Sequence, residues 1–435
     1  MTEGNTNAYQ LNIIPRPEHT VSRQQISEAA LKVLYRLHKA GYRACLVGGG
    51  VRDVLLGKQP KDFDIATDAT PDQVNGLFNN CRLIGRRFRL AHIRYGREII
   101  EVATFRQHDT ESSKTQLNDE GRILRDNTFG GIEEDAMRRD FTINALYYDI
   151  SDYSVLDYAH GLEDIKSRTL KLIGDPVTRY KEDPVRMLRA VRFAAKLQFS
   201  IDPQAEQAIF ESGHLLRDIP AARIYDEVLK IFHSGYALKA YELLRHYDLF
   251  QYLFPELDRH LKSEPSEAML DFIEQAMVNT DLRVQQEQGV SPAFIFASLL
   301  WPLVHLRAIQ LQSEKMGTIQ ALQGAGSEII AELVKTISIP RRFSQVARNI
   351  WSMQPRFCNT LGKQPQRLLS HPNFRAGYDF FCIQSMVGLT TFQLCEWWTE
   401  YQKHHTLPKT FPDTQKPGHH RRPHRNRSRQ HKPKP

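Results

Sequence analysis

Two hydrophobic patterns divide the chain into a first part and a longer second part. Between residues 43 and 105, short apolar or alternating runs recur between Gly, Pro, Asp and Asn residues, which predicts a small mixed β-sheet. These runs lie at 43–47, 62–67, 81–85, 88–95 and 98–105. After about residue 175 the strand signals fade, and apolar positions keep helical spacing to about residue 403. We therefore expect an α/β head followed by an all-α remainder.

Local signals add two helices and one loop to the head. Helical spacing over 22–40 predicts a helix that Ser22 or Ser27 caps. A threonine before a proline predicts that a second helix covers 70–78. The stretch 107–127 is polar and aperiodic, which predicts a mobile loop.

The positive charge of the chain gathers at its C-terminus. The formal net charge is +8, and the segment from Lys416 to Pro435 carries eight Lys and Arg residues and no acid. Because this segment also lacks apolar residues, we expect a disordered tail that binds a polyanion through its phosphates. A tail that serves solubility alone is the alternative. The arginines expected to make phosphate contacts are Arg421, Arg422, Arg425, Arg427 and Arg429.

Composition excludes several classes of protein. A chain of 435 residues with 41% hydrophobic and 25% charged residues is typical of a globular protein with about two to four domains. No apolar run approaches the roughly 20 residues that cross a bilayer, so we expect no membrane contact. The cysteines have neither zinc-ligand spacing nor a disulfide framework, which favours a reduced, cytoplasmic chain. They are Cys45, Cys81, Cys358, Cys382 and Cys395.

The densest chemical signal is a glycine turn. A predicted strand ends at Val47, residues 48–50 are all glycine, and a short helix is expected to begin near Val51. Backbone amides in such a turn can approach an oxyanion closely, and Arg52 adds a positive charge. The pattern predicts a triphosphate cradle, although a plain tight turn has the same appearance.

Two aspartates follow on the next predicted strand. Asp62 and Asp64 are separated by Phe63, so their side chains should lie on one face of the strand about 6 to 7 Å apart. Carboxylates so placed can hold Mg²⁺ ions, and Glu101 on a later strand is the candidate third carboxylate. A solvated strand end and an exposed strand glutamate are the alternatives.

Two arginine-rich segments are candidates for nucleotide recognition. Arg138, Arg139 and Asp140 precede an apolar stretch and suit phosphate and ribose contacts, unless the arginines are merely solvated beside a capping aspartate. Further on, Asp183 precedes a helix with a packed apolar face. An adjacent arginine ridge, which could hold a base or phosphates or be solvated, consists of Arg186, Arg189 and Arg192.

These segments occur in the order of a known superfamily. LVGGGVRDVLLG, DFD, RRDFTINALYYD and EDPVRMLRAVRFA resemble the motifs of the class II nucleotidyltransferases, which include tRNA CCA-adding enzymes and bacterial poly(A) polymerases. The resemblance covers about residues 40 to 200 and implies a polymerase-β-like head followed by all-α neck and body domains and a disordered basic tail. The expected divisions are a flexible N-terminus (1–20), head (21–175), neck (176–265), RNA-binding body (266–405) and tail (406–435).

The resemblance also implies roles for individual residues. Asp62, Asp64 and Glu101 match metal-binding and catalytic carboxylates, and Asp140 matches a further active-site acid. Implied nucleotide contacts come from Gly48, Gly49, Arg52, Arg139, Asp183, Arg186, Arg189 and Arg192. Two Mg²⁺ ions, or Mn²⁺, would be the cofactors and ATP the substrate.

The segment 83–93, LIGRRFRLAHI, resembles the poly(A) polymerase branch. The Arg-rich tail and the lack of an HD phosphohydrolase signature favour the same branch. The implied function is template-independent addition of AMP to RNA 3′ ends, with RNA-decay machinery as partners. A CCA-adding enzyme and a non-catalytic RNA-binding adaptor are the alternatives.

Overall fold

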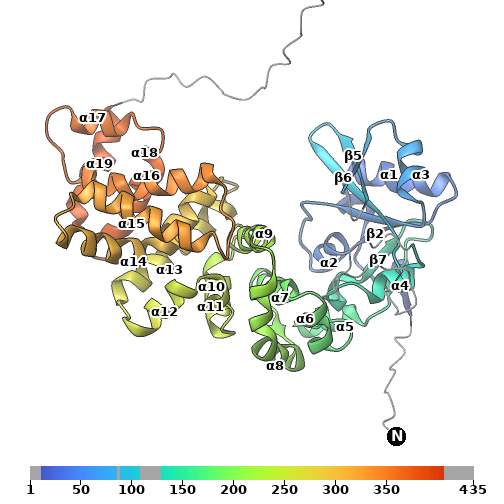
Figure 1. The fold of residues 1–435 in the computed structure, drawn as a ribbon. Coiled ribbons are helices and arrows are strands. Elements are labelled where there is room, and N and C mark those ends of the chain that lie inside the picture. The colour runs from blue at the N-terminus through green and yellow to red at the C-terminus, as the bar shows by residue number, and fades with distance from the viewer. Residues whose placement is uncertain (1–10, 86–88, 108–128, 406–435) are drawn as a thin grey trace, which may run out of the picture.

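The computed structural model describes residues 11–85, 89–107 and 129–405. Figure 1 shows a sheet-containing head at one end, a bundle of helices at the other end and a helical connection between them. The arginines expected in the tail and nearly all of the expected loop 107–127 lie outside the described residues.

The head is built on an eight-stranded sheet with the order β1-β8-β7-β2-β3-β6-β5-β4. Within the described residues, β3 and β6 pair in parallel and all other neighbours in this sheet pair antiparallel. The strands are β1 (Asn12–Ile14), β2 (Ala44–Val47), β3 (Asp64–Thr67), β4 (Cys81–Ile84), β5 (Leu90–Tyr95), β6 (Glu98–Thr104), β7 (Leu146–Asp149) and β8 (Val155–Asp157). The expected α/β head is confirmed, and β1 shows that part of the segment 1–20, expected to be flexible, joins the sheet by pairing with β8.

Short helices connect these strands. They are α1 (Glu28–Lys39), α2 (Gly49–Leu55), α3 (Pro71–Leu77), α4 (Ile132–Met137) and α5 (Gly161–Ser167). The helix predicted over 22–40 is wrong at its start, because Ser22 caps a separate 3₁₀ turn and Ser27 caps α1. Ile26 lies between them in an extended conformation. The two serines proposed as alternative caps therefore each begin a different segment.

A helical neck follows the head. Its helices are α6 (Pro176–Glu182), α7 (Val185–Leu197), α8 (Pro203–Ser212), α9 (Ala221–Phe232), α10 (Ala237–His246), α11 (Phe250–Leu253) and α12 (Pro255–Ser263). Two-residue strands β9 (Thr169–Leu170) and β10 (Ser200–Ile201) pair in parallel where head and neck meet. The predicted apolar face of α7 is confirmed: Val185, Leu188, Val191 and Ala195 are buried.

Within the described residues the body has seven helices, the last four of which share an aromatic-rich cluster separate from the main core. They are α13 (Glu267–Gln285), α14 (Pro292–Ser313), α15 (Thr318–Leu333), α16 (Arg341–Phe357), α17 (Gln364–Leu369), α18 (Phe374–Met386) and α19 (Phe392–His404). The expectation that no apolar run has membrane-spanning length is wrong for α14, since its 22 residues meet that test. However, 61% of its apolar window is buried inside the fold, as in the core helix of a globular domain.

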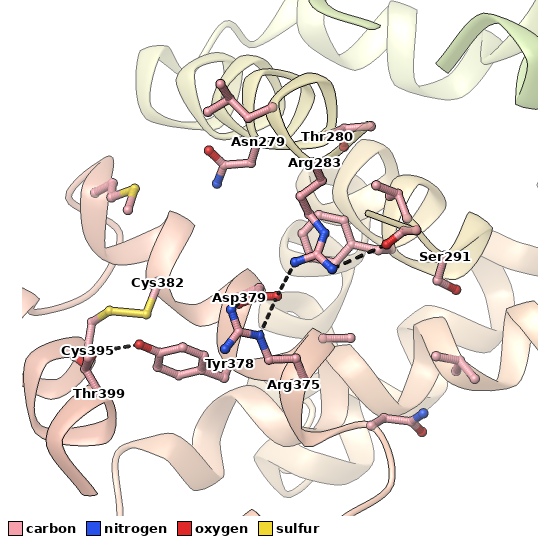
Figure 2. Close-up of a pocket in the computed structure, with 18 of the residues that line it drawn as sticks. Asn279, Thr280, Arg283, Ser291, Arg375, Tyr378, Asp379, Cys382, Cys395 and Thr399 are labelled. Atoms are coloured by element: carbon pink, nitrogen blue, oxygen red, sulfur yellow. Dashed lines mark hydrogen bonds and ion pairs between the residues drawn. A yellow bond between two sulfur atoms is a disulfide. The ribbon is translucent and has the colours of Figure 1, made fainter. Parts of the chain in front are cut away.

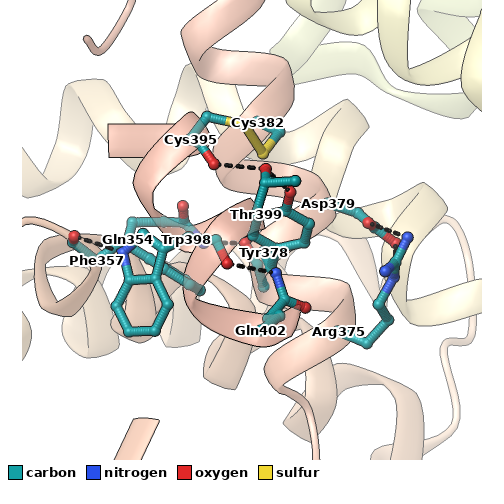
Figure 3. The surroundings of a disulfide bond; sticks show 11 residues. Gln354, Phe357, Arg375, Tyr378, Asp379, Cys382, Cys395, Trp398, Thr399 and Gln402 are labelled. Carbon is teal, nitrogen blue, oxygen red and sulfur yellow. Dashed lines mark hydrogen bonds and ion pairs between the residues drawn. A yellow bond between two sulfur atoms is a disulfide. The ribbon is translucent and has the colours of Figure 1, made fainter. Parts of the chain in front are cut away.

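The body also contains a disulfide and a large cavity. The expectation of free thiols throughout is wrong, because Cys382 of α18 and Cys395 of α19 form a disulfide, as Figure 3 shows. The antiparallel helices bring their Cα atoms to 5.4 Å, a proximity that a spacing of 13 residues does not reveal. This disulfide forms part of the wall of a cavity of about 990 Å³ (Figure 2). None of the residues expected in the active site lines this cavity.

Candidate active site

The register of the head sheet places the expected carboxylates side by side. Val47 of β2 pairs with Asp64 of β3, and Asp64 pairs with Glu101 of β6. Glu101 pairs in turn with His92 of β5, and His92 with Arg82 of β4. Directly paired residues project from the same face of a sheet. We call Asp64, Glu101, His92 and Arg82 the polar row.

The other end of this row is apolar. Val47 and, on β7, Tyr147 belong to one buried cluster beneath α4. The change from apolar to charged side chains occurs between β2 and β3, where the glycine turn leaves the sheet. The carboxylates therefore stand beside the turn that was expected to hold phosphates.

Asp62 adds a third negative charge next to this row. Phe63 is buried, whereas Asp62 and Asp64 are both exposed to solvent, as expected for alternating side chains. The pKa of Asp64 is raised to about 6, first because surrounding protein atoms displace water from one side of its carboxylate, and second because Glu101 and Asp62 are negative. Arg139 opposes this shift.

These carboxylates fit a metal that is shared with a substrate. Their mutual repulsion favours the binding of a cation. Within the described part of the chain, no group of three or more acidic, His or Cys side chains is arranged to hold an ion alone. Mg²⁺ is commonly held by one or two carboxylates together with substrate phosphates. The donor set therefore suits ions that arrive with a nucleotide.

Gly48 forms the turn itself. Its φ of +69° is one that side chains rarely adopt, and it serves as the N-cap of α2. The helix begins at Gly49, two residues earlier than expected, so only the first glycine makes the sharp turn. A Cβ atom on Gly48 would also contact the Arg139 guanidinium.

The Arg52 guanidinium was expected to be accessible to a phosphate, but it is buried. Its side chain is only 3% exposed and lies with its guanidinium over the Phe193 ring. It donates hydrogen bonds to Asn144 Oδ1 at 2.6 Å and to Asp53 Oδ1 at 2.6 and 2.8 Å. Arg52 thereby fastens the glycine turn to the segment that follows Asp140.

An aspartate that sequence reasoning missed organises the first arginine pair. Asp135 of α4 is buried and accepts hydrogen bonds from Arg138, Arg139 and the Tyr147 hydroxyl, the last at 2.7 Å. Burial opposes ionisation, but the charges of Arg139 and Arg138 lower the pKa of Asp135. The spacing of three and four residues from Asp135 to Arg138 and Arg139, at the end of α4, was the available signal.

Asp140 connects the head to the neck. It accepts hydrogen bonds from the Phe141 amide at 2.8 Å and from Asn144 Nδ2 at 3.1 Å. Its other oxygen lies 2.5 Å from a terminal nitrogen of Arg189 on α7. Burial raises the pKa of Asp140, but Arg189 and then Asn144 more than offset this effect, so the net shift is downward.

The remaining expected residues lie around the start of α7. Asp183 pairs with Arg223 of α9 at 2.8 Å, and Arg186 donates to Glu182 and to the Arg179 carbonyl. Burial lowers the pKa of Arg192. Glu182 and Arg179 are near Arg186 in the sequence, whereas Arg223 lies 40 residues from Asp183, and for this reason Arg223 escaped sequence reasoning.

Family comparisons agree with this geometry. Residues 44–171 match the poly A polymerase head domain, residues 198–261 the probable RNA and SrmB-binding site of polymerase A, and residues 314–432 the polymerase A arginine-rich C-terminus. Poly(A) polymerase I of Salmonella typhi is 50% identical over 399 residues, which are 90% of this chain and 86% of the relative. The chain belongs to the poly(A) polymerase I family. The family member of Haemophilus influenzae is 44% identical over 403 residues, with coverage of 91% and 89%.

CCA-adding enzymes are more distant from this poly(A) polymerase I family member. The enzyme of Bacillus pumilus is 37% identical over 230 residues, 53% of this chain and 56% of that protein. A solved tRNA-processing enzyme shares the fold with a TM-score of 0.61 and 22% identity, and covers 89% of this chain and 93% of its own. The expected superfamily, its fold and the poly(A) branch are confirmed.

Proposed function

We propose that this chain transfers AMP from ATP to RNA 3′ ends without a template. In this reaction the RNA 3′ oxygen bonds to the α-phosphorus of ATP, the bond to the bridging oxygen breaks, pyrophosphate leaves and the hydroxyl proton passes to solvent. The observation that carries the proposal is the direct pairing of Asp64 with Glu101 beside the glycine turn. Membership of the poly(A) polymerase I family supports adenylate as the added group.

The three carboxylates would serve the reacting atoms. Asp62, Asp64 and Glu101 would hold two divalent ions, Mg²⁺ or Mn²⁺, which activate the attacking hydroxyl and neutralise the leaving pyrophosphate. Glu101 also orients the RNA 3′ hydroxyl. The raised pKa of Asp64 supports this assignment, because after burial its next cause is the negative charge of Glu101.

The turn and the following segment would hold the triphosphate and the ribose. Backbone amides at Gly48 and Gly49 contact the β and γ phosphates, and Arg52 supports the turn from beneath through Asn144. Arg139 supplies positive charge near Asp64. Asp140, kept ionised by Arg189, accepts hydrogen bonds from the sugar.

Base selection would come from the neck. Asp183 and Arg186 are held by Arg223 and Glu182, so their donor and acceptor atoms keep fixed positions. The arginine ridge completes this surface. A pocket with fixed hydrogen-bonding groups rejects a wrong base strongly, because a mismatch leaves buried polar groups unpaired.

The remaining divisions would bind RNA. We propose that the neck and body (176–265 and 266–405) guide RNA to the head (21–175), and that the tail (406–435) binds phosphates. The match of residues 198–261 to an RNA and SrmB-binding site supports a link to RNA processing and decay. We expect AMP addition and the RNA processing that follows it to take place in the cytoplasm.

The decisive test is nucleotide choice on an unstructured, non-tRNA primer. Long A tracts with ATP and no extension with CTP are expected. Additions confined to tRNA would favour a CCA-adding enzyme, and absence of pyrophosphate release would favour an adaptor. Asp62→Asn should abolish AMP incorporation and leave RNA binding intact, with Asp68→Asn, just beyond the other end of β3, as the control. Normal turnover by Asp62→Asn would contradict the assignment.

A further inference from the structure

The polar row does not end at the expected carboxylates. His92 of β5 is the direct cross-strand partner of Glu101, just as Asp64 is its partner on the other side. Glu101 therefore has a carboxylate neighbour on one side and an imidazole on the other. The segment 83–93 contains this histidine, and the reaction described above gives it no task.

The two side chains are in contact. His92 Nε2 lies 3.2 Å from Glu101 Oε1. The His92 side chain is 21% exposed and the Glu101 side chain 48% exposed, so the histidine is the more firmly packed member of the pair. A ring fixed in the sheet can thus anchor a longer and more open side chain.

Glu101 needs such an anchor. A half-exposed glutamate has several accessible rotamers, and holding it in one of them costs conformational entropy. The negative charge of Asp64, its direct partner on β3, also repels it. Without a contact on the β5 side, repulsion would displace the Glu101 carboxylate from Asp64.

We infer that His92 is a positioning residue for the reaction, which holds Glu101 through Oε1 and leaves Oε2 for the RNA 3′ end and its metal ion. The inference rests on the proposed role of Glu101. Because His92 acts through Glu101, its loss should lower turnover rather than ATP affinity. A hydrogen bond to a charged group is worth about tenfold in such an equilibrium.

The first experiment compares two substitutions of similar size. His92→Leu should lower kcat about tenfold with KM for ATP unchanged, and His92→Gln, whose amide can still donate, should recover most of the loss. Arg94→Met, two residues further along the same strand, is the matched control. Equal losses in the Leu and Gln variants would overturn the inference, as would a change in KM alone.

A second readout is independent of turnover. Binding of Mn²⁺ with α,β-methylene-ATP, followed by electron paramagnetic resonance of free Mn²⁺, should weaken several-fold in His92→Leu and recover in His92→Gln. Thermal unfolding of both variants checks that β5 is intact. Unchanged Mn²⁺ binding in folded His92→Leu protein would contradict the inference.

A double-mutant cycle separates this inference from the proposed function. If His92 acts through Glu101, adding His92→Leu to Glu101→Gln should cause no further loss. Equal losses in both backgrounds would show that His92 acts elsewhere and would leave the role of Glu101 standing. Full activity of Glu101→Gln would instead refute the assignment of Glu101, and the inference with it.

Discussion

Two aspartates, one in the head and one in the body, both have a raised pKa but stand beside opposite charges. Burial raises the pKa of Asp64 and of Asp379. Beside Asp64 the next largest influence is the negative Glu101, whereas beside Asp379 it is the positive Arg375. Negative charges thus gather at the head site, whereas in the body cavity the negative charge of Asp379 is balanced by arginine.

This difference teaches which of the two regions carries the chemistry. The body cavity is large, and Arg283 and Arg375 both lie near the Asp379 carboxylate, at 3.8 and 3.1 Å (Figure 2). Its charges are already paired. At the polar row Glu101 contacts the His92 imidazole, but Asp64 forms no ion pair with any described residue, so a cation and a triphosphate can lower the energy of the site. Uncompensated charge marks the reaction site better than cavity volume does.

Removing one aspartate from each region should give the sharpest contrast. Asp64→Asn should reduce AMP incorporation about a thousandfold, because it removes a carboxylate from the reacting centre. Asp379→Asn should leave AMP incorporation unchanged. Primer extension with ATP measures both. A comparable loss in the two variants would show that the body cavity takes part in the reaction.

The disulfide offers a second contrast, in stability. Replacing Cys382 and Cys395 with serine opens a loop whose ends are 13 residues apart, and the free energy of unfolding of the body should fall by at most about 3 kcal/mol. Turnover of ATP should not change, because α18 and α19 lie in the body. Cys358→Ser, which removes an exposed free thiol, is the control. Denaturant unfolding measures the effect, and loss of turnover in folded protein would contradict it.

The pH dependence of stability should differ in sign at Asp135 and Asp379. The lowered pKa of Asp135 means that its ionised form stabilises the fold at neutral pH, a contribution lost as pH falls through the folded-state pKa. The raised pKa of Asp379 means that its ionised form costs stability at neutral pH, a cost that disappears in acid.

Asparagine substitutions test this difference. At neutral pH, Asp135→Asn should destabilise the protein by about 1 kcal/mol, and Asp379→Asn should leave it unchanged or slightly more stable. The Asp379 difference should shrink as the pH is lowered toward about 4, whereas the Asp135 difference should persist to about pH 4 and shrink only below it. Thermal unfolding across this range provides the measurement, and parallel curves for the two variants would refute the assigned directions.

Local signals in the sequence predicted local structure well. Thr70 forms the expected N-cap of α3 in a capping box with Gln73, and the helix ends one residue before the predicted end. The missed strand β7 is buried along its whole length, so it shows no alternation of polar and apolar residues. β1 and β8 are three residues each, which is too short for a pattern.

In the candidate site, too, the sequence indicated the residues themselves but not their long-range contacts. Motifs indicated Asp64 and Glu101 because residue type and strand spacing are written along the chain. The contacts of other site residues depend on partners far away in sequence, such as Arg189 for Asp140 and Arg223 for Asp183. The burial of Arg52 could not be foreseen either, because it follows from the packing of Phe193 from α7 against the head.

The turn between β5 and β6 has a consequence for how this protein can change. Tyr95 pairs with Glu98, so only Gly96 and Arg97 connect the two strands. A one-residue shift in the register of β6 would turn Glu101 to the opposite side of the sheet, so the turn that fixes this register also fixes the direction of the carboxylate. An insertion at Gly96 and Arg97 that shifts the register should therefore abolish turnover, whereas one absorbed as a longer turn should preserve it.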